Sequence, residues 1–120
     1  MSLNHALDNI LNNGRRCKVR KEVAISQVFQ ENLSHDSLFY NGRFDFVIYE
    51  QEYGGKELPI LAIELDGMEH QDDELVKKRD REKANICRAH GFELIRVENS
   101  YARRYYYIKG ILEEYFKRIR

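Results

Sequence analysis

Two acidic residues interrupt an apolar run in the middle of the chain. The segment from Leu58 to Asp66, LPILAIELD, begins as a buried strand would and then carries carboxylates at Glu64 and Asp66. Because side chains alternate along a strand, both acids share one face, and Asp45 in a preceding strand at Arg43–Glu50 would lie beside them in a hairpin. Clustered carboxylates repel one another and resist desolvation, and a hard divalent cation relieves both problems. The pattern predicts a Mg²⁺ or Mn²⁺ site with ligands from Asp45, Glu64 and Asp66. The alternative is that the acids lie at strand ends in water.

The next segment is expected to form a helix from about Asp72 to His90, because acidic residues favour its start and Gly91 favours its end. On a helical wheel, Arg79 and Lys83 fall within the arc that carries the apolar residues Leu75, Val76, Ile86 and Cys87. Directed toward the acids, Lys83 would position or activate an attacking water, and Arg79 would bind a phosphate oxygen or brace a carboxylate. The alternative is that both cations snorkel around the edge of the core.

A histidine follows the acids at short range. Gly67 allows the chain to turn sharply off the strand, so that His70 stays close to Asp66. His70 would then act as a metal ligand, a general base or an acid for the leaving group, and a surface-loop histidine is the alternative. A zinc site from His70, Cys87 and His90 is disfavoured, because the spacing of the last two is unlike that of structural zinc ligands.

The elements that must position these residues follow from periodicity and turn signals. The expected order is α-β-β-β-α-β-α: a helix at Asn4–Leu11, strands at Lys18–Phe29, Arg43–Glu50 and Leu58–Asp66, the helix to His90, a strand at Phe92–Val97 and a helix at Arg103–Ile119. Turn signals stand at Asn41-Gly42 and Gly54-Gly55. Three strands in a meander and a helical crossover to a fourth predict an α/β fold. Its mixed four-stranded sheet would be flanked by helices.

Composition sets the broad class of the protein. With 120 residues, of which 42% are hydrophobic, the chain suits one domain over residues 1–120, either alone or as part of a longer protein. Twenty basic and 20 acidic residues balance, which argues against a purely electrostatic partner but allows a local basic patch. The two cysteines form no disulfide-framework pattern, and no apolar run approaches about 20 residues. We therefore expect a cytoplasmic protein without a membrane span.

The ordered set of chemical residues resembles a known superfamily. The set is Asp45, then Glu64-x-Asp66-Gly67-x-x-His70, then Arg79-Asp80-x-x-Lys83, then Gly91-Phe92 and Leu94-Ile95-Arg96-Val97. Between Lys18 and Val97 it resembles the PD-(D/E)XK nucleases, which have the restriction-endonuclease-like fold. Within them it looks like the branch of very-short-patch-repair endonucleases, with its E-x-D-G-x-x-H signature. The resemblance implies an α-β-β-β-α-β core, extended here by a C-terminal helix.

The resemblance also implies roles for individual residues. Asp45 matches the metal-binding aspartate of the second core strand, and Glu64 matches the acidic ligand of the (D/E)-x-K element. Asp66 stands where the superfamily usually has a lysine. Variant families move that lysine to the next helix, where Lys83 is the candidate, whereas the E-x-D-G-x-x-H signature assigns the chemistry to His70. Both options remain open.

These observations predict a Mg²⁺- or Mn²⁺-dependent endonuclease that acts on nucleic acid, with DNA rather than RNA as the expected substrate. The alternative is a non-catalytic nucleic-acid-binding or assembly module that keeps the same fold. Basic and aromatic residues expected to line a nucleic-acid surface are Arg79, Arg15, Arg16, Lys18, Arg20, Arg103, Arg104, Tyr105 and Tyr106. For any one of them, an ordinary solvated surface position is the alternative.

Overall fold

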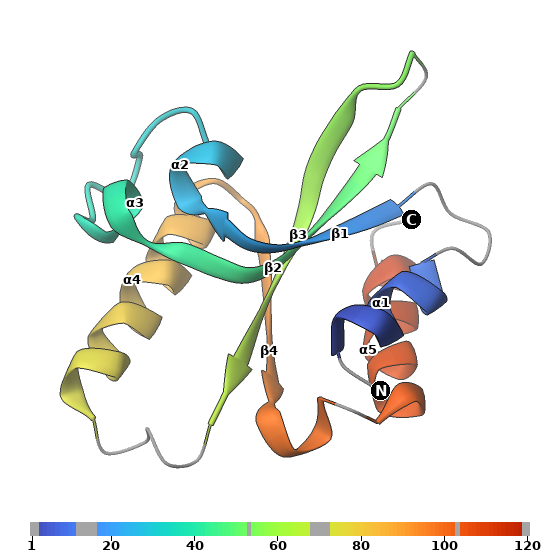
Figure 1. Cartoon of the computed structure of the whole chain (residues 1–120). Coiled ribbons are helices and arrows are strands. Elements are labelled where there is room, and N and C mark those ends of the chain that lie inside the picture. The colour runs from blue at the N-terminus through green and yellow to red at the C-terminus, as the bar shows by residue number, and fades with distance from the viewer. Residues whose placement is uncertain (1–2, 12–16, 53, 68–72, 103, 119–120) are drawn as a thin grey trace.

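Four strands form one mixed sheet in the order β1-β2-β3-β4 in the computed structural model of the chain (Figure 1). The structure describes residues 3–11, 17–52, 54–67, 73–102 and 104–118. The first three strands are antiparallel neighbours, and β4 joins the edge of β3 in parallel. The strands are β1 (Cys17–Ala24), β2 (Arg43–Gln51), β3 (Glu57–Asp66) and β4 (Glu93–Glu98). The expected mixed four-stranded sheet flanked by helices is therefore confirmed.

Three of the helices are those expected from the sequence: α1 (Leu3–Leu11), α4 (Glu74–Ala89) and α5 (Tyr105–Arg118). Helix α4 begins where expected because the Asp73 carboxylate accepts hydrogen bonds from the backbone N–H groups of Leu75 and Val76. Two single-turn helices and one 3₁₀ turn were not expected: α2 (Ile25–Val28), α3 (Leu38–Asn41) and η2 (Asn99–Tyr101). None of the described helices has both the length and the apolar character needed to cross a membrane.

The strand expected at Lys18–Phe29 was wrong beyond Ala24. The backbone N–H of Ile25 donates to the Gly42 carbonyl at 3.1 Å, and Phe29 N–H donates to the Ile25 carbonyl at 3.1 Å, which closes one helical turn. Ile25 is fully buried, so this β-branched residue is needed here for packing in the core and is not a sign of strand structure. A Cβ at Gly42 would lie 2.9 Å from Ile25 Cδ1, so this glycine permits close approach of α2 and α3.

Helices cover both faces of the sheet (Figure 1). On one face Ile86 of α4 packs with Val47 and Ala62, which are paired residues of β2 and β3. On the other face Ile108 of α5 belongs to a core cluster with Ile48 and with residues of α1. The strand alternation expected from the sequence thus places one hydrophobic core on each side of the sheet. Helices α2 and α3 lie on the α4 side (Figure 1).

Candidate active site

Asp45 and Glu64 face each other on neighbouring strands, one step beyond the Phe46–Ile63 pair of β2 and β3. Glu64 Oε2 accepts a hydrogen bond from the Asp45 backbone N–H at 2.5 Å. In return, Asp45 Oδ2 accepts one from the Leu65 backbone N–H at 2.8 Å. These two reciprocal bonds hold both carboxylates beside each other at the end of the hairpin, as the alternation of side chains predicted.

Lys83 of α4 forms an ion pair with Glu64 Oε1. Lys83 lies on the same side of the helix as the buried residues Ile86 and Cys87, because positions three and four apart share a helix face. Packing of those two residues against the sheet therefore carries the lysine to the acid. Lys83 was expected near the carboxylates of both Glu64 and Asp66, and its contact with Glu64 is confirmed, whereas Asp66 pairs with Arg96. The side chains of the Lys83–Glu64 pair are only 14% and 4% exposed.

Burial raises the pKa of the Glu64 carboxyl above its ordinary value. The Lys83 ammonium and the hydrogen bond from the Asp45 N–H act in the opposite direction, and the negative charge of Asp45 adds to the increase. Glu64 is thus a desolvated carboxylate whose charge is only partly compensated by its protein neighbours. Additional positive charge beside it would stabilise its ionised form.

Asp66 has a different partner. Its Oδ1 lies 3.4 Å from Arg96 Nη1, and the same guanidinium lies 3.3 Å from Asp80 Oδ1 and donates to the Asp80 carbonyl at 2.9 Å. Arg96 therefore ties the ends of β3 and β4 to α4. This role of Arg96 was not predicted from the sequence. The signal for it was a cation between the apolar residues of the strand Glu93–Glu98.

The three-carboxylate arrangement expected from the sequence is not seen. In the part of the chain that the structure describes, no group of three or more His, Cys, Asp or Glu side chains is placed to hold a metal ion. Asp45 and Glu64 are in contact, whereas Asp66 pairs with Arg96. The structure thus brings together a two-carboxylate and lysine cluster, Asp45–Glu64–Lys83, and the roles of its members as metal ligands remain predictions.

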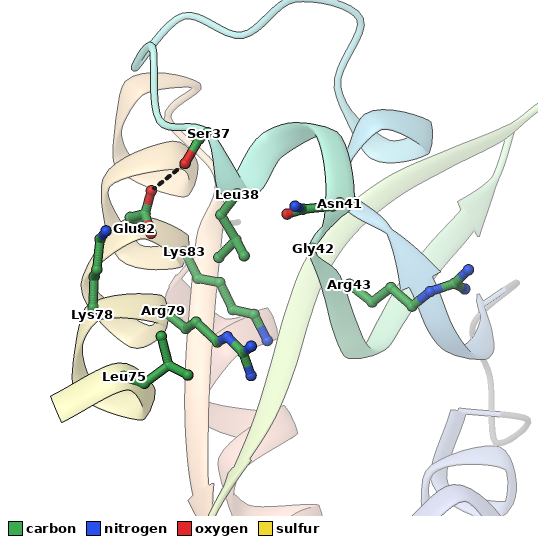
Figure 2. Close-up of a pocket in the computed structure, with 10 residues that line it drawn as sticks. All are labelled: Ser37, Leu38, Asn41, Gly42, Arg43, Leu75, Lys78, Arg79, Glu82 and Lys83. Carbon is green, nitrogen blue, oxygen red and sulfur yellow. Dashed lines mark hydrogen bonds between the residues drawn. The ribbon is translucent and has the colours of Figure 1, made fainter. Parts of the chain in front are cut away.

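A groove with a volume of about 570 Å³ adjoins this cluster, and Lys83 belongs to both. Its other lining residues are Ser37, Leu38, Asn41, Gly42, Arg43, Leu75, Lys78, Arg79 and Glu82. Figure 2 shows Arg79 and Lys83 extending from α4 into the same space, with α3 opposite. Ser37 Oγ donates to Glu82 Oε1 at 3.4 Å and links α3 to α4. The α3 wall of this groove was not predicted, because a helix of one turn is too short to show a hydrophobic period.

The other basic residues expected at a nucleic-acid surface are dispersed. Arg104 is exposed, with its guanidinium 4.3 Å from the ring centre of Tyr101. Lys18 and Arg20 form ion pairs with Glu57 at 3.2 and 2.6 Å, and these cations, Arg20 first, lower the pKa of that carboxyl. Since Glu57 begins β3 and Asp66 ends it, this pair of cations lies at the far end of the strand from the candidate site. His70, Arg15, Arg16 and Arg103 lie outside the described residues.

Cys87 and His90, two of the three residues of the disfavoured zinc site, both pack against neighbouring side chains, and the third, His70, lies outside the described residues. The Cys87 thiol is buried, and burial, followed by the nearby Glu64 charge, raises its pKa to about 12. A thiol that stays un-ionised in buried, apolar surroundings is chemically inert. The His90 ring stacks on Phe29, with centroids 4.0 Å apart and planes 8° from parallel. Both residues therefore serve packing between α4, α2 and the sheet.

Cys87 is expected to resist alkylation by iodoacetamide in the folded protein at neutral pH, because its thiol is both buried and un-ionised. Mass spectrometry of peptides from protein treated in native buffer and in concentrated urea provides the measurement. The Cys87 peptide is expected to carry the label only after urea treatment. Equal labelling in both conditions would indicate an exposed thiolate and would restore the zinc hypothesis.

Comparison with known proteins gives one family match. A family model described as "Protein of unknown function (DUF2726)" matches residues 2–114. No curated protein and no solved structure matches the chain.

Proposed function

The chain belongs to the DUF2726 family, and from its candidate active site we propose that it is a metal-dependent nuclease. It would hydrolyse phosphodiester bonds, and DNA rather than RNA is the expected substrate. The observation that supports this most is the Asp45–Glu64–Lys83 cluster, in which two carboxylates on adjacent strands meet a lysine from the following helix. The element order and the strand pairing support the narrower proposal of a restriction-endonuclease-like core, with α2 and α3 inserted between β1 and β2.

Asp45 and Glu64 fit Mg²⁺ or Mn²⁺ as ligands. Their oxygens are the donors that hard cations prefer, and Mg²⁺ in phosphate chemistry is usually held by one or two carboxylates together with water and substrate oxygens. Both Glu64 oxygens and Asp45 Oδ2 accept one hydrogen bond each, which leaves each oxygen a second lone pair. The raised pKa of Glu64 indicates a carboxylate that additional positive charge would stabilise. Asp66 pairs through Oδ1 with Arg96 and is not part of this two-carboxylate arrangement.

When bound, such an ion polarises the phosphate and lowers the pKa of an attacking water. The chain itself supplies the surrounding positive charge. The Lys83 ammonium has three donors and uses one on Glu64, so the others can reach a phosphate oxygen or the attacking water. As negative charge develops on the phosphate, a fixed cation in a partly buried site stabilises it strongly. His70 is the rival for the proton chemistry.

Supercoiled plasmid incubated with the protein is expected to be nicked or linearised in Mg²⁺ or Mn²⁺ and to stay intact in a chelator. Asp45→Asn is expected to lower the rate by at least about a hundredfold, since it removes one charged ligand from the cluster. Glu114→Gln removes an exposed acid of α5 and serves as the charge-matched control, with an unchanged rate. Gel electrophoresis of the plasmid forms over time measures the rates.

Cleavage that persists in Asp45→Asn at the wild-type rate would overturn the proposal, because a contaminating nuclease or a different site would then be responsible. DNA binding without cleavage in either metal would instead favour the alternative, a non-catalytic nucleic-acid-binding or assembly module with the same fold. Isothermal titration with Mn²⁺, compared between wild type and Asp45→Asn, tests the metal site without reference to activity.

A further inference from the structure

The groove between α3, the start of β2 and the first turns of α4 has two kinds of lining. Arg79 and Lys83 bring positive charge, and Leu38 and Leu75 bring apolar surface. Figure 2 shows the cationic ends of Arg79 and Lys83 near each other, with Leu75 and Leu38 beside them. Since Lys83 also contacts Glu64, the groove leads directly to the candidate active site.

Among the described residues that line the groove, Arg79 is a cation without a carboxylate partner, and Lys78 is another. Within residues 3–118, as far as they are described, Lys83 is paired with Glu64, whereas no ion pair or hydrogen bond involves Arg79, which is exposed. Glu82, the acid in the groove, is bonded instead to Ser37 at 3.4 Å. A planar guanidinium without a carboxylate partner suits a phosphate group, which it can bind through two parallel hydrogen bonds.

The apolar part of the groove suits the face of a base. Leu75 is 57% exposed although it stands on the same helix arc as buried Ile86 and Cys87. Leu38 stands on the opposite wall of the groove, so both walls carry apolar surface. The Asn41 amide on α3 adds a donor and an acceptor for a base edge. Phosphate recognition, apolar contact and an amide in one groove together describe a nucleotide.

We propose that this groove binds one unpaired nucleotide, with its phosphate on Arg79 and its base against Leu75 and Leu38. Its volume of about 570 Å³ falls in the range of small-molecule sites. A base within a duplex has both faces stacked and its edge paired, so it must leave the stack to enter such a groove. The site therefore selects single-stranded or frayed nucleic acid. The inference rests on the proposed function only in placing the bound nucleotide next to the bond that is cleaved.

Binding measured without metal separates this inference from catalysis. The probes are a short fluorescein-labelled single strand of DNA and a blunt duplex of the same length and sequence, titrated by fluorescence anisotropy in a chelating buffer. The wild-type protein is expected to bind the single strand at least about tenfold more tightly than the duplex, since stacking and unpairing penalties apply only to the duplex. Equal affinity for the two probes would overturn the inference.

Arg79→Ala and Arg81→Ala form a matched pair, because both remove one exposed arginine from α4 but only Arg79 lines the groove. Arg79→Ala is expected to weaken single-strand binding about tenfold, the typical effect of a lost charge-assisted hydrogen bond. Arg81→Ala is expected to change it less than twofold. Equal losses in both variants would indicate general electrostatic attraction and would overturn the inference.

The two proposals fail in different ways. If the plasmid stays intact in Mg²⁺ and Mn²⁺ while the single-strand preference depends on Arg79, the nuclease proposal fails and the nucleotide site stands. If the plasmid is cleaved through Asp45 but Arg79→Ala binds the single strand as wild type does, the nucleotide site fails and the nuclease proposal stands.

Discussion

Lys83→Ala is expected to lower the turnover number of DNA cleavage by on the order of a thousandfold, the size of effect seen when one preorganised electrostatic group is removed from an active site. The dissociation constant for DNA is expected to change only a few-fold, because Lys83 is 14% exposed and already engaged with Glu64. An interaction made mainly in the transition state lowers turnover more than affinity. Single-turnover cleavage and metal-free anisotropy measure the two quantities separately.

His70→Ala is the comparison that decides between the two candidates for the proton chemistry. If Lys83→Ala cleaves almost as fast as wild type while His70→Ala is inactive, the histidine carries the chemistry and the migrated-lysine hypothesis is wrong. Lys83→Arg is expected to retain more activity than Lys83→Ala, because it keeps the positive charge. It is expected to be less active than wild type, because the guanidinium differs in shape from the ammonium. Circular dichroism of each variant at the assay temperature establishes that the fold is intact.

Lys83→Met is expected to destabilise the metal-free protein by about 3–5 kcal/mol near pH 8, because it leaves Glu64 as a buried unpaired charge. Losing the Lys83 ammonium raises the pKa of Glu64 further above its ordinary value of 4.5. For a carboxyl whose folded-state pKa is raised, the native state binds more protons, so stability falls as pH rises from the unfolded pKa through the folded one. The loss is therefore expected to shrink toward about pH 4.5. Urea denaturation at several pH values measures it.

The double variant Lys83→Met with Glu64→Gln serves as the control, since it removes both charges and keeps similar side-chain volumes. It is expected to regain most of the stability lost in Lys83→Met and to lose the pH dependence. A loss in Lys83→Met of the same size at both ends of the pH range would contradict the electrostatic explanation. Lost packing of the lysine stem would then account for it.

The parts of the site that periodicity controls were predictable from the sequence. Alternation along β2 and β3 placed Asp45 beside Glu64, and the helical arc of α4 brought Lys83 to the same face. Both predictions depend on regular elements of eight residues or more, in which each side chain's direction follows from its position. The apolar residues Ile86 and Cys87, which follow Lys83 by three and four positions, identified the side of α4 that faces the sheet.

What the sequence did not reveal depends on contacts between distant segments. The strand predicted to reach Phe29 ends at Ala24, because its partner β2 begins opposite it at Arg43 and the Phe29 N–H bonds back to the Ile25 carbonyl. Asp66 was expected beside Glu64 as a metal ligand, but it forms an ion pair with Arg96 of β4. Arg96 is brought there by the parallel pairing of β3 with β4, and the periodicity of a sequence does not specify which strands pair. Leu75 lies on the apolar arc of α4 but remains 57% exposed in the first turn of the helix, where it lines the groove.

The contacts that build the Asp45–Glu64–Lys83 cluster are local along the chain. Asp45 and Glu64 are 19 residues apart, and so are Glu64 and Lys83. By contrast, α1 and α5 pack against each other from opposite ends of the sequence, on the other face of the sheet. Closing a long loop costs more conformational entropy than closing a short one. Assembly of the cluster therefore costs less conformational entropy than the packing of α1 against α5.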